Sequence, residues 1–206
     1  MSTWTALYVA TDDTDRVVAA ISDLVPGLGV STGPYPHDLG TFRAFSSEPP
    51  THLAVGRAGP GWTAVPHNSF EVLDEWGISL SRDLATRVIV VQAQSTASSY
   101  YFALYEKGEQ LREIAICSSD DSDEVNAGAP LPFEGPEPGI ETAHGYIFDY
   151  DAIEAYCRHF GLELEIDEAS PWTTLRHLKL HGPQPLPPVP TAVPTATAGK
   201  PWWKFW

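Results

Sequence analysis

The sequence contains few cysteines, few basic side chains and no long apolar run. Its two cysteines, Cys117 and Cys157, have no metal-binding spacing. We expect two reduced, mostly buried thiols in a cytoplasmic protein, with a single disulfide as the alternative. No stretch reaches the ~20 apolar residues of a transmembrane helix. The first residues carry no basic segment of the kind that opens a secretory signal, so we expect no targeting segment.

Basic side chains are scarce relative to acidic ones. Twelve Lys and Arg face 27 Asp and Glu, which gives a formal net charge of −15. Two of the twelve, Lys200 and Lys204, lie near the C-terminus, so the rest of the chain is more acidic still. This charge repels nucleic acid, because phosphate contacts dominate nucleic-acid affinity, and it repels anionic membrane surfaces. It favours solubility and basic protein partners.

Familiar catalytic sequence patterns are also missing. There is no Gly-x-Ser-x-Gly segment, no cysteine with a paired histidine and no phosphate loop, since the glycine-rich segment 56–61 contains Pro60 and precedes a strand. His177 and His181 have the i, i+4 spacing of zinc ligands on a helix, but no third ligand or adjacent Glu accompanies them. We therefore predict no catalytic residue, no metal site and no cofactor.

Two acidic segments allow a functional and a structural interpretation. Residues 12–15, Asp-Asp-Thr-Asp, follow an apolar strand, but the second Asp and the Thr are misplaced for a phosphotransferase nucleophile. Helix capping is favoured, because acidic side chains suit a helix N-terminus. Residues 119–124 lie in a long acidic loop, 118–142, which lacks the ligand spacing of a calcium loop. A solvated loop is favoured there.

Apolar periodicity predicts one α+β domain, residues 1–182, with a mainly antiparallel sheet and two or three helices packed on one face. We expect strands at 3–11, 53–58, 61–66, 87–94, 100–106, 109–117 and 162–166, and a strand or a helix at 172–180. We expect helices between the acidic turn and Pro26, at 79–84 with a Ser cap, and at 152–160 with Asp149 or Asp151 as the cap.

Turn residues complete this prediction. Gly59-Pro60-Gly61 and Lys107-Gly108 each separate two predicted strands, which indicates two β-hairpins. Residues 26–51 are rich in Gly, Pro and Ser and show little periodicity, so no element is predicted there.

The C-terminal tail differs from the rest of the chain. Residues 183–199 are an uncharged Pro/Ala/Thr-rich linker, which we expect to be extended and to span roughly 50 Å at ~3.1 Å per residue. Residues 200–206 then form an aromatic and basic segment. Its predicted partner-binding side chains are Lys200, Trp202, Trp203, Lys204, Phe205 and Trp206.

These features predict an interaction protein more readily than an enzyme. Trp side chains supply contact area at interfaces, and a flexible linker raises the effective concentration of a terminal docking peptide. The favoured function is an immunity-type or adaptor protein of a bacterial system that binds a protein partner through the tail. Docking of the tail on its own body or on a second copy, and contact with a membrane interface, are the alternatives. An enzyme with a site built from scattered residues, with His144, Asp149 and Asp151 as the candidate cluster, is the alternative function.

Overall fold

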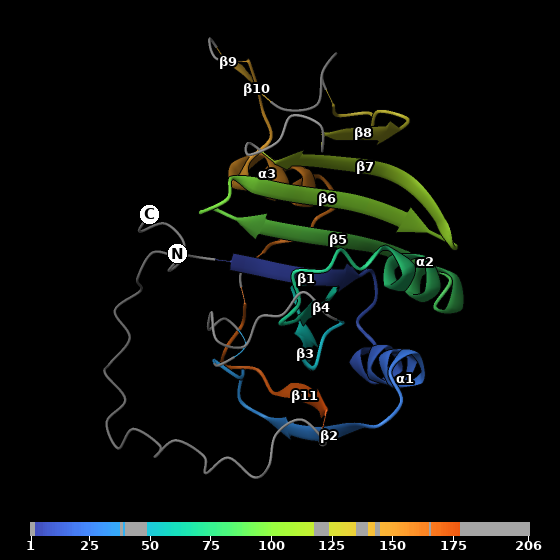
Figure 1. The fold of residues 1–206 in the computed structure, drawn as a ribbon. Helices are drawn as coiled ribbons and strands as arrows, with labels where there is room; N and C mark the ends of the chain where they lie inside the picture. The colour runs from blue at the N-terminus through green and yellow to red at the C-terminus, as the bar shows by residue number, and fades with distance from the viewer. Residues whose placement is uncertain are drawn as a thin grey trace.

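A computed structural model describes residues 3–37, 39, 49–117, 124–134, 140–142, 145–164 and 166–177. Nine of its strands form one antiparallel sheet (Figure 1). From edge to edge these strands are β2 (Leu28–Gly33), β11 (Trp172–His177), β3 (His52–Arg57), β4 (Thr63–Pro66), β1 (Thr3–Val9), β5 (Arg87–Gln94), β6 (Ser99–Glu106), β7 (Glu109–Cys117) and β8 (Val125–Gly128). β9 (Ile140–Thr142) and β10 (Gly145–Ile147) form a separate antiparallel pair.

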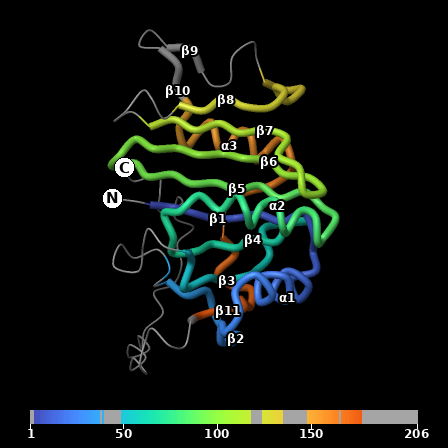
Figure 2. The backbone as a smooth tube through the Cα atoms, turned by 45° about the vertical axis from the view of Figure 1, so that its right-hand side comes forward, coloured from blue at the N-terminus to red at the C-terminus, as the bar shows by residue number. Residues whose placement is uncertain are grey.

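Helices cover both faces of this sheet. α1 (Thr14–Leu24) and α2 (Asp74–Asp83) pack on one face, where Val17, Ile21 and Leu80 join a core with side chains of β1 and β5. α3 (Tyr150–His159) packs on the opposite face, where Ile153 and Cys157 join a second core (Figure 2). The prediction of an α+β fold with a mainly antiparallel sheet is confirmed. The prediction that two or three helices pack on one face holds for α1 and α2 only, because α3 packs on the other face.

Local sequence signals account for the central part of the sheet. β5, β6 and β7 pair in chain order, as the alternating pattern predicted. Lys107 and Gly108 join β6 to β7 with φ values of 54° and 85°, the left-handed conformations that a two-residue hairpin turn requires. The Gly59-Pro60-Gly61 turn likewise joins β3 to β4, which are antiparallel. Both predicted hairpins are confirmed.

The acidic turn has the structural role that helix capping predicted. The Asp13 side chain accepts a hydrogen bond from the backbone N–H of Arg16 at 3.0 Å, and α1 begins at Thr14. Asp12 accepts a hydrogen bond from the backbone N–H of Gly61 at 2.9 Å and so ties the turn to the β3–β4 hairpin. Both carboxylates therefore stabilise local structure through hydrogen bonds to the backbone.

Four local predictions were wrong or incomplete. β2 lies in the segment that showed little periodicity, and β8 lies in the predicted acidic loop, where it pairs with β7. α2 begins five residues before the predicted helix 79–84, after Leu73, so Ser79 is not its cap. Residues 162–164 form no strand. The element at 172–177 is a strand, β11, which settles the choice between strand and helix.

Candidate functional site

The described chain ends in a strand inside the sheet. β11 pairs with β2 on one side and with β3 on the other. All nine strands of the large sheet therefore lie between Thr3 and His177. The predicted partner-binding residues 200–206 and the linker 183–199 lie outside the described residues, as do His181 and the acidic residues 118–123. Tail docking therefore stays a prediction.

Only part of the candidate catalytic cluster lies within the described residues. Asp149 caps α3, because its side chain accepts a hydrogen bond from the backbone N–H of Ala152 at 3.0 Å. Asp151 is exposed in the first turn of the same helix. His144 lies outside the described residues, so the enzyme alternative that depends on it stays a prediction.

One end of the sheet carries an apolar row across four strands. Trp4 of β1 pairs with Ala93 of β5, Ala93 pairs with Tyr100 of β6, and Tyr100 pairs with Ile116 of β7. Residues that are directly paired in a sheet point to the same face, and all four belong to the core on the α3 side. Ala93 is buried, whereas Trp4, Tyr100 and Ile116 are only partly buried. The row therefore continues the core out to the surface.

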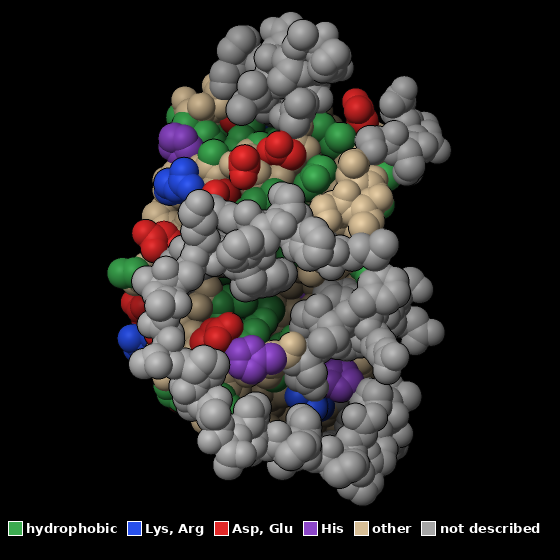
Figure 3. Space-filling view, turned by 90° about the vertical axis from the view of Figure 1, so that its left-hand side faces the viewer, with side chains coloured by type: hydrophobic (Ala, Val, Ile, Leu, Met, Phe, Trp, Pro, Cys, Tyr) green, Lys and Arg blue, Asp and Glu red, His purple; other side chains and the backbone are tan. Residues whose placement is uncertain are grey.

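The start of α3 lies against this row. The rings of Trp4 and Tyr150 meet edge to face with centroids 5.6 Å apart. Partial burial raises the pKa of Tyr100, and the nearby carboxylates of Asp149 and Asp151 raise it further. We call this set the acidic–aromatic surface; it consists of Trp4, Tyr100, Ile116, Asp149, Tyr150 and Asp151. Figure 3, which faces the end of the sheet where β1 and β6 begin, shows acidic side chains among hydrophobic ones.

A second polar cluster joins α2 to the sheet. The hydroxyl of Tyr101 donates to Asp74 Oδ1 at 2.5 Å, and the hydroxyl of Tyr105 donates to the same oxygen. Burial and these hydrogen bonds to Asp74 raise the pKa of both tyrosines, so both phenols keep their protons at neutral pH. Beneath them, a Cβ added at Gly77 would lie 2.5 Å from the Tyr105 ring. The cluster therefore holds α2 close to β6.

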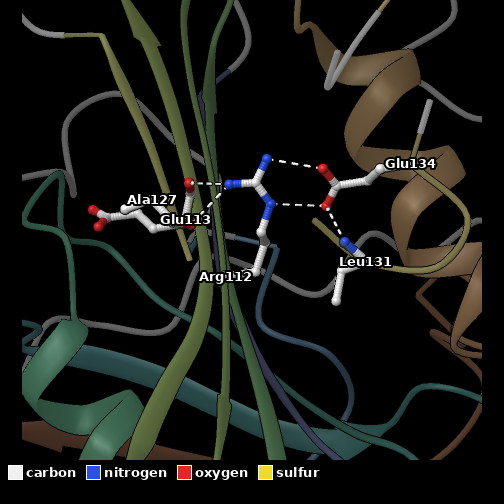
Figure 4. Close-up of polar contacts among 5 residues, drawn as sticks. All are labelled: Arg112, Glu113, Ala127, Leu131 and Glu134. Atoms are coloured by element: carbon white, nitrogen blue, oxygen red, sulfur yellow. Dashed lines mark hydrogen bonds and ion pairs between the residues drawn. The ribbon is translucent and has the colours of Figure 1, made fainter. Parts of the chain in front are cut away.

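A buried ion pair joins β7 to the segment after β8. The side chains of Arg112 and Glu134 have no exposed area. The guanidinium donates through Nε and Nη2 to the two carboxylate oxygens, each at 2.8 Å, and through Nη1 to the carbonyl of Ala127 at 2.8 Å (Figure 4). The backbone N–H of Leu131 also donates to Glu134 at 3.0 Å. The bidentate geometry is that of a strong structural pair.

Two further groups that often carry chemistry are buried in unreactive states. Burial lowers the pKa of His67 to about 3, so this imidazole is neutral at pH 7, and its Nδ1 accepts from the backbone N–H of Ser69 at 3.3 Å. Burial raises the pKa of the Cys157 thiol, which disfavours the nucleophilic thiolate. Cys117 and Cys157 are both free, as predicted, and Cys117 is only half-buried.

Sequence reasoning had missed the sites that depend on chain pairing. It named neither Arg112 with Glu134 nor the row from Trp4 to Ile116. The spacing of Tyr101 and Tyr105 was a usable signal, because residues four apart on a strand lie on one face. Within the described ranges, no group of three His, Cys, Asp or Glu side chains is arranged to hold a metal ion.

The helices α1, α2 and α3 have 11, 10 and 10 residues, and none in the described part of the chain has the length and apolar character needed to cross a membrane. Comparison with protein families, with curated proteins and with solved structures finds no match to this chain.

Proposed function

We propose that this chain is a non-enzymatic interaction protein, of the immunity or adaptor kind in a bacterial cytoplasm, that binds a protein partner through residues 200–206. The observation that carries the proposal is the segment Lys-Pro-Trp-Trp-Lys-Phe-Trp at the end of an uncharged, proline-rich linker. Trp and Phe side chains bury large apolar areas at interfaces. Two lysines and no acidic side chain make the segment basic, which suits an acidic surface on a partner.

The position where the described chain ends supports this proposal. β11 has a strand on each side, so the large sheet does not require another strand from the tail beside it. From the end of β11 at His177 to Lys200 the chain runs 23 residues, the difference between the two numbers. At ~3.1 Å per residue, an extended proline-rich chain of this length reaches roughly 70 Å. The body can thus stay folded while the terminal segment contacts a partner.

The basic tail and the acidic body favour partner surfaces of opposite charge. The body carries a net charge of −17, from 27 acidic and 10 basic side chains, because the tail beyond His181 contains Lys200 and Lys204 and no Asp or Glu. We infer that the tail binds an acidic or aromatic surface of its partner. A partner that also contacts the body would present basic side chains there.

The direct test is affinity capture from the native host with three proteins. These are the full-length chain, a chain that ends at Gly199, and a full-length chain with Trp202, Trp203, Phe205 and Trp206 replaced by Ala. We expect one protein to be captured by the first and lost from the other two. Its binding to purified full-length chain is then measured by titration calorimetry.

The thermal unfolding midpoint of each protein is the control. We expect similar midpoints for the three proteins, because the last described strand, β11, ends at His177, ahead of every changed residue. If the captured proteins are the same for all three and the midpoint of the shortened chain is lower, the tail is a structural part of the fold and the proposal is wrong.

A further inference from the structure

We propose that, in the absence of a partner, residues 200–206 dock in cis on the acidic–aromatic surface of the same chain. The inference rests on the proposed function of the tail as a docking peptide and adds a mode of regulation to it. A partner must then displace the tail from the body before it can bind.

The apolar part of the acidic–aromatic surface matches the aromatic part of the tail. Trp4, Tyr100 and Ile116 are partly exposed at paired positions of three strands, with Ala93 between the first two. Neighbouring strands are ~4.8 Å apart, so the row from Trp4 to Ile116 extends about 14 Å. Tyr150 widens it at one end by its edge-to-face contact with Trp4. Four aromatic side chains in seven residues can cover a surface of this size.

The charged part of the surface matches the lysines of the tail. Asp149 and Asp151 flank Tyr150, whose ring contacts Trp4, so their charges border the apolar row. Lys200 and Lys204 flank the first two aromatic side chains of the tail, Trp202 and Trp203. A peptide with lysines beside aromatic rings therefore finds carboxylates beside aromatic rings on its own body.

Because the linker tethers the tail to the body, a weak contact between the two is sufficient for docking. The segment that follows His177 reaches roughly 70 Å when extended, and so reaches any surface of the body. Tethering by a flexible linker gives an effective concentration of the order of millimolar. A contact between tail and body with a dissociation constant below this value is then formed in most molecules. The apparent affinity for a partner falls in proportion to the fraction of free tail.

Photo-crosslinking in the full-length chain tests the proposal. Phe205 is replaced by p-benzoylphenylalanine, and the crosslinked residues are mapped by mass spectrometry. We expect the crosslinks to concentrate on the peptides that carry Trp4, Tyr100 and Tyr150. Equal amounts of unlabelled and 15N-labelled chain are mixed before irradiation, and we expect each crosslink to join segments of one isotope only.

A matched pair of variants tests the charges. Asp149→Asn with Asp151→Asn removes two charges, and Asn remains a good helix cap. Asp13→Asn with Asp15→Asn removes the cap and first-turn charges of α1, which lies on the other face of the sheet. We expect the first pair to reduce the crosslinks about fivefold, as the loss of two exposed ion pairs allows. The second pair should leave them unchanged.

Several results would overturn the inference. Crosslinks spread evenly over the body, crosslinks that join the two isotopes, or an equal loss in both variant pairs would each exclude specific docking in cis. Capture of a partner by the tail without cis crosslinks would leave the proposed function intact and refute only this inference. Strong cis crosslinks without any captured partner would support the contact and refute the proposed function.

Discussion

Removing one member of the buried Arg112–Glu134 pair should destabilise the protein far more than removing both. Glu134→Leu leaves a guanidinium with no exposed area and removes both of its carboxylate bonds and the acceptor of the Leu131 N–H. Loss of one partner from a buried pair costs about 3–5 kcal/mol. The double variant Arg112→Met with Glu134→Leu leaves no uncompensated charge, so we expect it to be closer to the wild type than Glu134→Leu is.

Urea unfolding at pH 7, followed by circular dichroism, measures these differences in the free energy of unfolding. The exposed pair Arg82–Asp83, with side chains 59% and 54% exposed, is the control. We expect Asp83→Asn to change stability by less than about 1 kcal/mol. If Glu134→Leu costs no more than Asp83→Asn, or if the double variant is less stable than Glu134→Leu, the assigned role of the pair is refuted.

Three further predictions follow from the described contacts. Gly77→Ala places a Cβ 2.5 Å from the Tyr105 ring and should cost about 1–3 kcal/mol in urea unfolding. Gly33→Ala is the control: no atom lies within 4 Å of the new Cβ, and Ala is favoured over Gly in a strand by roughly 0.5–1 kcal/mol, so we expect no loss of stability. The pKa of His67 falls from 6.5 to about 3 on folding, so the unfolded chain binds the extra proton. Stability is therefore complete above pH 6.5 and should fall by about 1.4 kcal/mol per unit as the pH drops toward 3, with a shallower fall in His67→Gln; equal slopes would contradict this. Deletion of residues 200–206 should raise the affinity of the body for a synthetic peptide of that sequence, because the docked tail no longer competes; an unchanged affinity would count against docking in cis.

The elements that the sequence predicted are those that short-range physics specifies. Asp13 caps α1 through a bond to the third residue after it. Lys107 and Gly108 set a hairpin whose two strands follow directly in the chain. Such contacts involve neighbours in sequence, so residue type and spacing are enough to predict them.

The elements that the sequence missed depend on distant partners. β2 has no strong apolar alternation and is a strand because it pairs with β11, more than 130 residues later along the chain. α2 begins at Asp74 without a side-chain cap, and the bonds from Tyr101 and Tyr105 to that residue come from β6. Propensity alone cannot predict a boundary that tertiary contacts determine.

The sequence by itself determined the fold class, the strong negative charge and the aromatic, basic end of the chain, because these follow from composition and local pattern. Only the tertiary structure brought Arg112 to Glu134, and Trp4 to Tyr150. It also aligned Trp4, Ala93, Tyr100 and Ile116 across four strands. Strand register and the packing of α3 determine these contacts, and both depend on residues that are far apart in the chain.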